Sequence, residues 1–137
     1  MGKNTEQKKR YSCHDIACVG RIFLEAAKQC NPQEVERVGW SHSLLIPIIV
    51  NMALSCELFF KAILKYHNQE IKTHNMEKLF EGLPEEIQKK LVDICICDCD
   101  KEEFRNSLRR VSNYFEEWRY LYERYPSSVE YTFLSRM

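Results

Sequence analysis

The residues with the clearest chemical potential are arginines in the second half of the chain. Three of them lie within the segment 105–110. Guanidinium groups bind phosphate oxygens through paired hydrogen bonds, so this spacing is compatible with a phosphate-contacting row on one helix. The candidate phosphate- or RNA-binding residues are Arg105, Asn106, Arg109, Arg110 and Arg119. The same row is an ordinary solvated helix face if the arginines pair with Glu102, Glu103 and Glu116.

A histidine and a group of three cysteines could also bind metal or move protons. His74 follows an expected loop and precedes an expected short helix, where a histidine serves either in a site or as a structural cap. Cys95, Cys97 and Cys99 alternate with other residues. Residues two apart on a helix point away from each other, and a zinc knuckle needs differently paired cysteines. We therefore expect structural thiols, no metal site and no cofactor.

Composition limits the kind of protein that can carry these residues. The chain has 137 residues, 45% hydrophobic and 29% charged, with a formal net charge of +0. This favours one compact domain and disfavours nucleic-acid binding through bulk charge. Four glycines and four prolines disfavour a turn-rich all-β fold. The apolar stretch 44–64 contains Pro47, Glu57 and Lys61, so we interpret it as a buried core helix in a cytoplasmic protein without a membrane span.

Hydrophobic periodicity predicts an all-α fold, with the second long helix at the centre of the bundle. The expected helices cover about 11–30, 43–67, 75–81, 84–97 and 101–124. The apolar face of the second comprises Leu45, Ile48, Ile49, Met52, Cys56, Phe59, Phe60 and Ile63. We expect Gly82 to end the short third helix in a left-handed conformation. The expected organisation is a flexible tail (1–9), a single domain (10–125) and an extension (126–137).

Three stretches together resemble the HEPN family (higher eukaryotes and prokaryotes nucleotide-binding). Residues 53–64, ALSCELFFKAIL, resemble the family's long second helix, and residues 74–80, HNMEKLF, resemble its His-Asp-Leu-x-x-Leu element. Residues 115–123, FEEWRYLYE, are similar to the aromatic last helix of one subgroup. The resemblance covers residues 10 to 125. It implies an antiparallel bundle of four to five helices, usually homodimeric, and a role in toxin–antitoxin, abortive-infection or CRISPR systems.

Many HEPN proteins are metal-independent ribonucleases whose signature is Arg-x₄₋₆-His near the last long helix. No histidine follows His74 in this chain. If Arg105-Asn106 begins the signature, the histidine position holds Arg110, and arginine stays protonated and is not a general base. A literal match, Arg37-x₄-His42, lies before the second long helix.

These departures lead to three hypotheses about function. The first is a HEPN-like, non-catalytic protein that binds a protein, RNA or nucleotide partner, such as an antitoxin or another HEPN nuclease, in a defence setting. The second is a divergent metal-independent ribonuclease that uses His42 or His74. The third is a structural module that dimerises through the aromatic last helix.

Overall fold

The computed structural model describes residues 11–30, 45–95, 101–112 and 137. These residues form five α-helices and no strand, which confirms the expected all-α helical fold. The helices are α1 (Cys13–Gln29), α3 (Leu45–Tyr66), α4 (Met76–Glu81), α5 (Glu85–Cys95) and α6 (Lys101–Ser112). The expected tail, the last helix beyond residue 112 and most of the extension lie outside the described residues.

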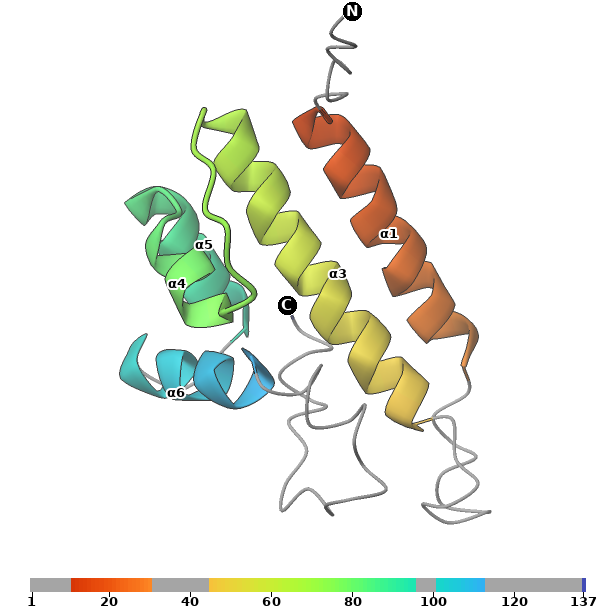
Figure 1. Ribbon diagram of the computed structural model, residues 1–137. Coiled ribbons are helices and arrows are strands. Elements are labelled where there is room, and N and C mark those ends of the chain that lie inside the picture. Colours follow the sequence, from red (N-terminus) through yellow and green to blue (C-terminus); the bar gives the residue numbers. More distant parts are fainter. Residues whose placement is uncertain (1–10, 31–44, 96–100, 113–136) are drawn as a thin grey trace, which may run out of the picture.

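Helices α1 and α3 run antiparallel and side by side along most of their length (Figure 1). Helix α1 begins at a capping box, in which the amide of Asp15 donates to Ser12 Oγ at 3.1 Å and the amide of Ser12 donates to Asp15 Oδ2 at 2.9 Å. Gly20 lies where the two helices meet. The buried Ser55 hydroxyl of α3 donates to the Gly20 carbonyl at 2.8 Å, so the absence of a side chain permits close approach.

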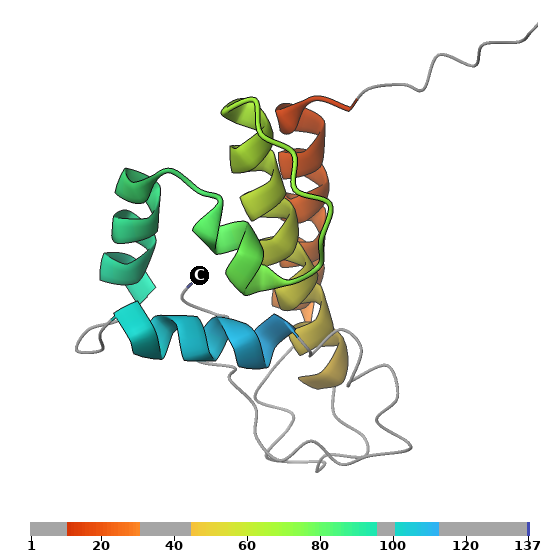
Figure 2. The ribbon, with the colours of Figure 1, turned by 60° about the vertical axis from the view of Figure 1, so that its left-hand side comes forward.

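The three shorter helices lie on the other side of α3, and α6 runs across the ends of α4 and α5 (Figure 2). Asn75 starts α4, because its side-chain oxygen accepts from the amide of Lys78 at 3.0 Å. The buried amide of Gln88 then ties α5 to the end of α4. It donates to the carbonyls of Leu83 at 2.7 Å and Glu81 at 3.2 Å.

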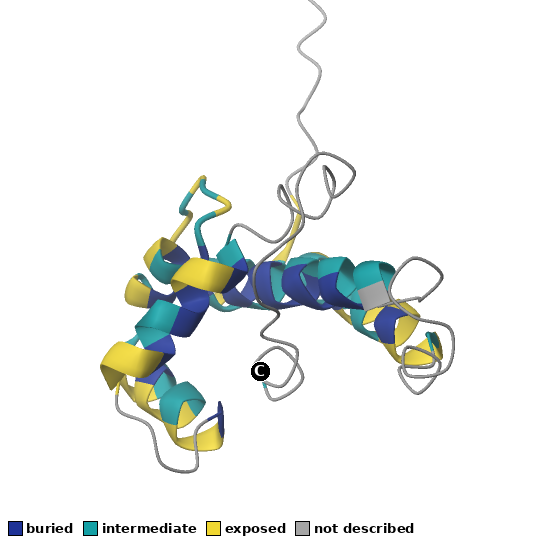
Figure 3. Cartoon of the chain, turned by 90° about the horizontal axis from the view of Figure 1, so that it is seen from below, coloured by how far each residue is buried: buried dark blue, intermediate teal, exposed yellow. Residues whose placement is uncertain are grey.

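The hydrophobic core centres on α3, as expected from its wide apolar face. Figure 3 shows its buried residues as a nearly continuous dark-blue stripe. Three phenylalanines from α3, α4 and α6 continue this core. The ring centroids of Phe60 and Phe80 are 6.4 Å apart, and those of Phe80 and Phe104 are 4.9 Å apart. Phe59 is half-buried and faces the α1 side, so Phe60 is the deeper of the two neighbouring rings.

The expected left-handed conformation of Gly82 is wrong. Its φ is −76° and its ψ is −13°, which any residue adopts. The structure gives a different reason for glycine here. A Cβ at this position would lie 2.3 Å from Ile71 Cδ1 and 3.2 Å from Leu64 Cδ2. Gly82 therefore leaves room for the loop residue Ile71 to pack against the core.

The most apolar part of α3, Ile46–Tyr66, is long and apolar enough to cross a membrane by length and composition alone. Half of its most apolar window is buried inside the structure, which is typical also of the core helix of a globular protein. The buried side chains of Ser55 and Glu57 interrupt this surface. The expectation of a buried core helix agrees with this packing, and cytoplasmic localisation stays a prediction.

Candidate functional site

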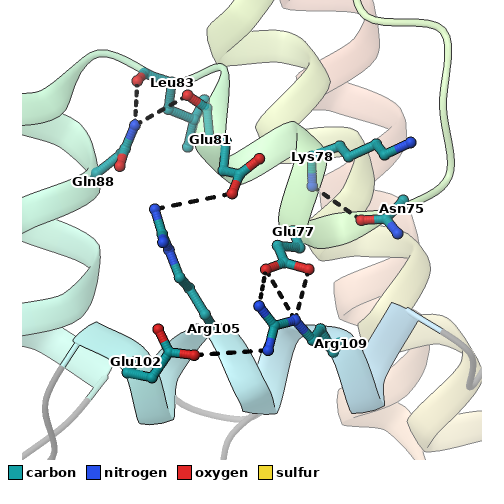
Figure 4. Close-up of polar contacts among 9 residues, drawn as sticks. All are labelled: Asn75, Glu77, Lys78, Glu81, Leu83, Gln88, Glu102, Arg105 and Arg109. Carbon is teal, nitrogen blue, oxygen red and sulfur yellow. Dashed lines mark hydrogen bonds and ion pairs between the residues drawn. The ribbon is translucent and has the colours of Figure 1, made fainter.

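The guanidinium group of Arg109 on α6 is held by the carboxylate of Glu77 on α4 (Figure 4). Arg109 Nε lies 3.0 and 2.9 Å from the two Glu77 oxygens, and Nη2 lies 2.6 Å from Oε1. The remaining nitrogen, Nη1, donates to Asn106 Oδ1 at 2.8 Å and lies 3.7 Å from Glu102 Oε1. This is the fork geometry that arginine uses for phosphate, here filled by a carboxylate of the same chain.

The other two arginines of α6 have different surroundings. Arg105 Nη2 lies 3.9 Å from Glu81 Oε1, while its Nε is buried and has no hydrogen-bond partner in the described part of the chain. Arg110 is exposed, and its Nη2 donates to Ser107 Oγ at 3.2 Å. The described residues of the row therefore lie on α6, and two of its arginines point towards glutamates of α4.

The Arg109–Glu77 pair changes the titration of both groups. The hydrogen bond from Arg109 holds the pKa of the Glu77 carboxyl below its usual range, with smaller contributions from the charges of Arg109 and Arg105. The same hydrogen bond and the charge of Glu77 raise the pKa of Arg109. Ionised Glu77 thus favours the folded state, in which its partner is in place.

Replacing Glu77 with glutamine is expected to flatten the acid limb of the stability profile. Because the folded-state pKa of Glu77 is lowered, its stabilisation is present above the unfolded-state pKa and disappears as pH falls through the folded-state value. The wild-type Tm should therefore fall more steeply than that of Glu77→Gln between about pH 5 and 3. Glu85→Gln, which removes the same charge from an exposed position on α5, is the control. Equal slopes for wild type and Glu77→Gln would contradict the prediction.

A second polar cluster joins α3 to the loop before α4. Glu57 is 8% exposed although it lies in an otherwise apolar helix. Its Oε1 accepts from Lys61 Nζ at 2.6 Å and is 2.9 Å from His74 Nδ1. The His74 side chain is 87% exposed. With Nδ1 directed at a carboxylate, its Nε2 is presented to solvent, which is the arrangement of an oriented general acid or base.

The two clusters lie on either side of the first turn of α4. The backbone amide of Met76 donates to Ser112 Oγ at 2.8 Å, and this hydroxyl in turn donates to the Leu108 carbonyl at 2.8 Å. The last turn of α6 therefore satisfies one of the free amides at the start of α4. His74 precedes this contact by two residues, and Glu77 follows it by one.

The structure brings four of the five candidate arginine-row residues onto α6, whereas Arg119 and the candidate base His42 lie outside the described residues. Sequence reasoning missed Glu77 and Glu81 as arginine partners. The four-residue spacing of Glu57 and Lys61 on a helix is the local signal for the second cluster. No such signal relates Glu77 to Arg109, because they are 32 residues apart.

The two buried cysteines of the described helices have the character of structural thiols. Cys56 and Cys95 are buried, and burial, with a smaller contribution from Cys95, raises the pKa of the Cys56 thiol to about 12. Such a thiol stays protonated at neutral pH. Cys97 and Cys99 lie outside the described residues. Among those that are described, no three His, Cys, Asp or Glu side chains gather as a metal site.

Comparison with known proteins yields no match to a protein-family model, a curated protein or a solved structure.

Proposed function

We propose that this chain is a HEPN-like helical protein that acts by binding a partner, and not by cutting RNA, in a prokaryotic or phage defence or toxin–antitoxin setting. The observation that carries the proposal is the bidentate contact between Arg109 and Glu77. A phosphate would bind this guanidinium only after displacing the Glu77 carboxylate, which already accepts its hydrogen bonds. With Arg105 also near Glu81, the surface between α4 and α6 carries alternating, compensated charges that suit a protein partner better than RNA.

The resemblance to HEPN nucleases points the same way. The position at which their signature would place a histidine holds Arg110, which donates to Ser107 and cannot take up a proton. Arg105 and Asn106 retain the beginning of the signature, but Asn106 accepts from Arg109 and thus supports the pair with Glu77. The residues at the positions of the nuclease signature therefore make their contacts with other residues of this chain.

An assay with single-stranded RNA and a metal chelator tests this proposal. We expect no cleavage, and binding no tighter than about 10⁻⁴ M at physiological salt, the weak end of non-specific binding. Arg105→Ala and Arg109→Ala should leave both results unchanged, as should the control Arg21→Ala on the exposed side of α1. Metal-free cleavage that disappears in Arg105→Ala while the protein remains helical would contradict the non-catalytic proposal.

The contact between Glu57 and His74 supports a second candidate, a metal-independent ribonuclease. A carboxylate on Nδ1 holds the histidine ring in one orientation and leaves Nε2 on its exposed side. In this version His74 moves the proton during attack by a ribose hydroxyl. His74→Ala should then abolish cleavage, whereas His67→Ala, an exposed histidine before the same loop, should not. If both variants, and His42→Ala, cleave RNA as the wild type does, the ribonuclease candidate fails.

The homodimer implied by the resemblance also stays a proposal. The aromatic segment that would form the interface, residues 115–125, lies outside the described residues. Light scattering of the purified chain distinguishes a monomer from a dimer. A monomer at all accessible concentrations would contradict both the homodimer and the structural dimerisation module.

A further inference from the structure

An apolar groove runs between α3 and α5 next to α1. Cys56, Phe59 and Ile63 form its α3 wall, Leu91 of α5 faces them, and Ala17 of α1 borders one side. Its volume is about 290 Å³. A groove with these walls gains stability when apolar side chains replace the water.

Met137 already lies in this groove. It is half-buried, lines the groove together with Leu91 and Phe59, and packs against the core. The residues immediately before it include three large apolar side chains, Tyr131, Phe133 and Leu134. Because a chain spans at most about 3.5 Å per residue, all three are tethered within about 20 Å of Met137.

We propose that the groove is the docking site of this chain's own segment 131–136, which inserts Phe133 and Leu134 beside Met137. Tethering favours this occupant over a separate molecule, because it raises the effective concentration of the segment at the groove to the millimolar range or above. The lining also fits its chemistry, since the walls are aliphatic, aromatic and thiol side chains. The inference stands apart from the proposed function, which concerns the surface between α4 and α6.

Photo-crosslinking in the full chain tests the proposal directly. Benzoylphenylalanine in place of Leu134 is irradiated in the purified protein, and the products are mapped by mass spectrometry. We expect cross-links within one chain to residues 56–63 of α3 or to Leu91 of α5. Cross-links between two chains would overturn the proposal in favour of a second copy, and the absence of cross-links to the groove would overturn docking itself.

A matched pair of variants on α5 provides the control. Leu91 lines the groove, whereas Ile94 on the same helix is 69% exposed. A lysine at position 91 places a charge among apolar walls, so Leu91→Lys should reduce the intramolecular cross-link about tenfold or more. Ile94→Lys should leave the yield unchanged, and equal yields in the two variants would overturn the proposal.

A double-mutant cycle gives a second measurement that does not depend on the cross-linker. Leu91→Ala, Phe133→Ala and the double variant are compared by thermal unfolding of the full chain. If the two side chains touch, the double variant should lose less Tm than the sum of the losses in the two single variants. Additive losses would overturn the contact between segment 131–136 and the groove.

Discussion

Replacing Phe80 with alanine is expected to lower the free energy of unfolding by about 3–5 kcal/mol, the largest effect of any substitution considered for this chain. Phe80 is 0% exposed, and its ring lies between those of Phe60 and Phe104. The cost combines the lost transfer of the ring from water with the cavity that remains. Because α3, α4 and α6 all border this position, their collapse into the cavity is restricted.

Thermal and denaturant unfolding measure this effect. A loss of 3–5 kcal/mol is a large part of the stability of a typical domain and corresponds to a Tm lower by about 10 °C or more. Phe59→Ala is the matched control, since Phe59 is half-buried and should cost less. A loss below about 1 kcal/mol for Phe80→Ala would mean that the three rings do not form the core.

Replacing Gly20 with valine is expected to have the second largest effect, a loss of about 3 kcal/mol from overpacking between α1 and α3. A Cβ at Gly20 would lie 3.2 Å from Phe59 Cε1 and 3.3 Å from Leu58 Cβ. The branched methyl groups of valine extend further into α3. They would separate the helices and lengthen the 2.8 Å hydrogen bond from Ser55 to the Gly20 carbonyl.

Two further variants distinguish overpacking from the general effect of valine in a helix. Ala26→Val, on an exposed position of α1, carries the lower helix propensity alone and should cost well under 1 kcal/mol. Gly20→Ala should be near neutral, because the better propensity of alanine offsets the tight Cβ contacts. Equal losses for Gly20→Val and Ala26→Val, measured by denaturant unfolding, would contradict close packing at Gly20.

The fold class and helix positions could be predicted from the sequence because they depend on local patterns. The start of α4 after Asn75 is visible as a side chain that caps a helix, and α1 ends at Gln29, close to the expected residue 30. Gly82 shows the limit of such reasoning. Glycine after a helix suggests a left-handed cap, but here its missing side chain leaves room for Ile71, eleven residues earlier in the chain.

The candidate site could also be predicted only where it depends on a local pattern. The arginine row on α6 follows from helical spacing, and Glu102 was correctly expected to lie near it, at 3.7 Å from Arg109. Glu77 holds Arg109 more closely, and no local pattern relates the two residues, because α6 reaches α4 through tertiary packing. The same packing determines whether a guanidinium faces a ligand or a neighbouring carboxylate. The sequence therefore identified the residues of the row but not their partners.

The hydrogen bond from the Met76 amide to Ser112 joins the elements that carry the two polar clusters. Ser112 is on the helix that carries Arg109, and Met76 begins the helix that follows His74. We expect a partner that shifts α6 to strain or break the hydrogen bond between Met76 and Ser112. The loop that presents His74 should then move as well. Linkage makes the effect reciprocal, so a ligand at His74 that favours one position of α6 alters the affinity at the arginines by the same factor.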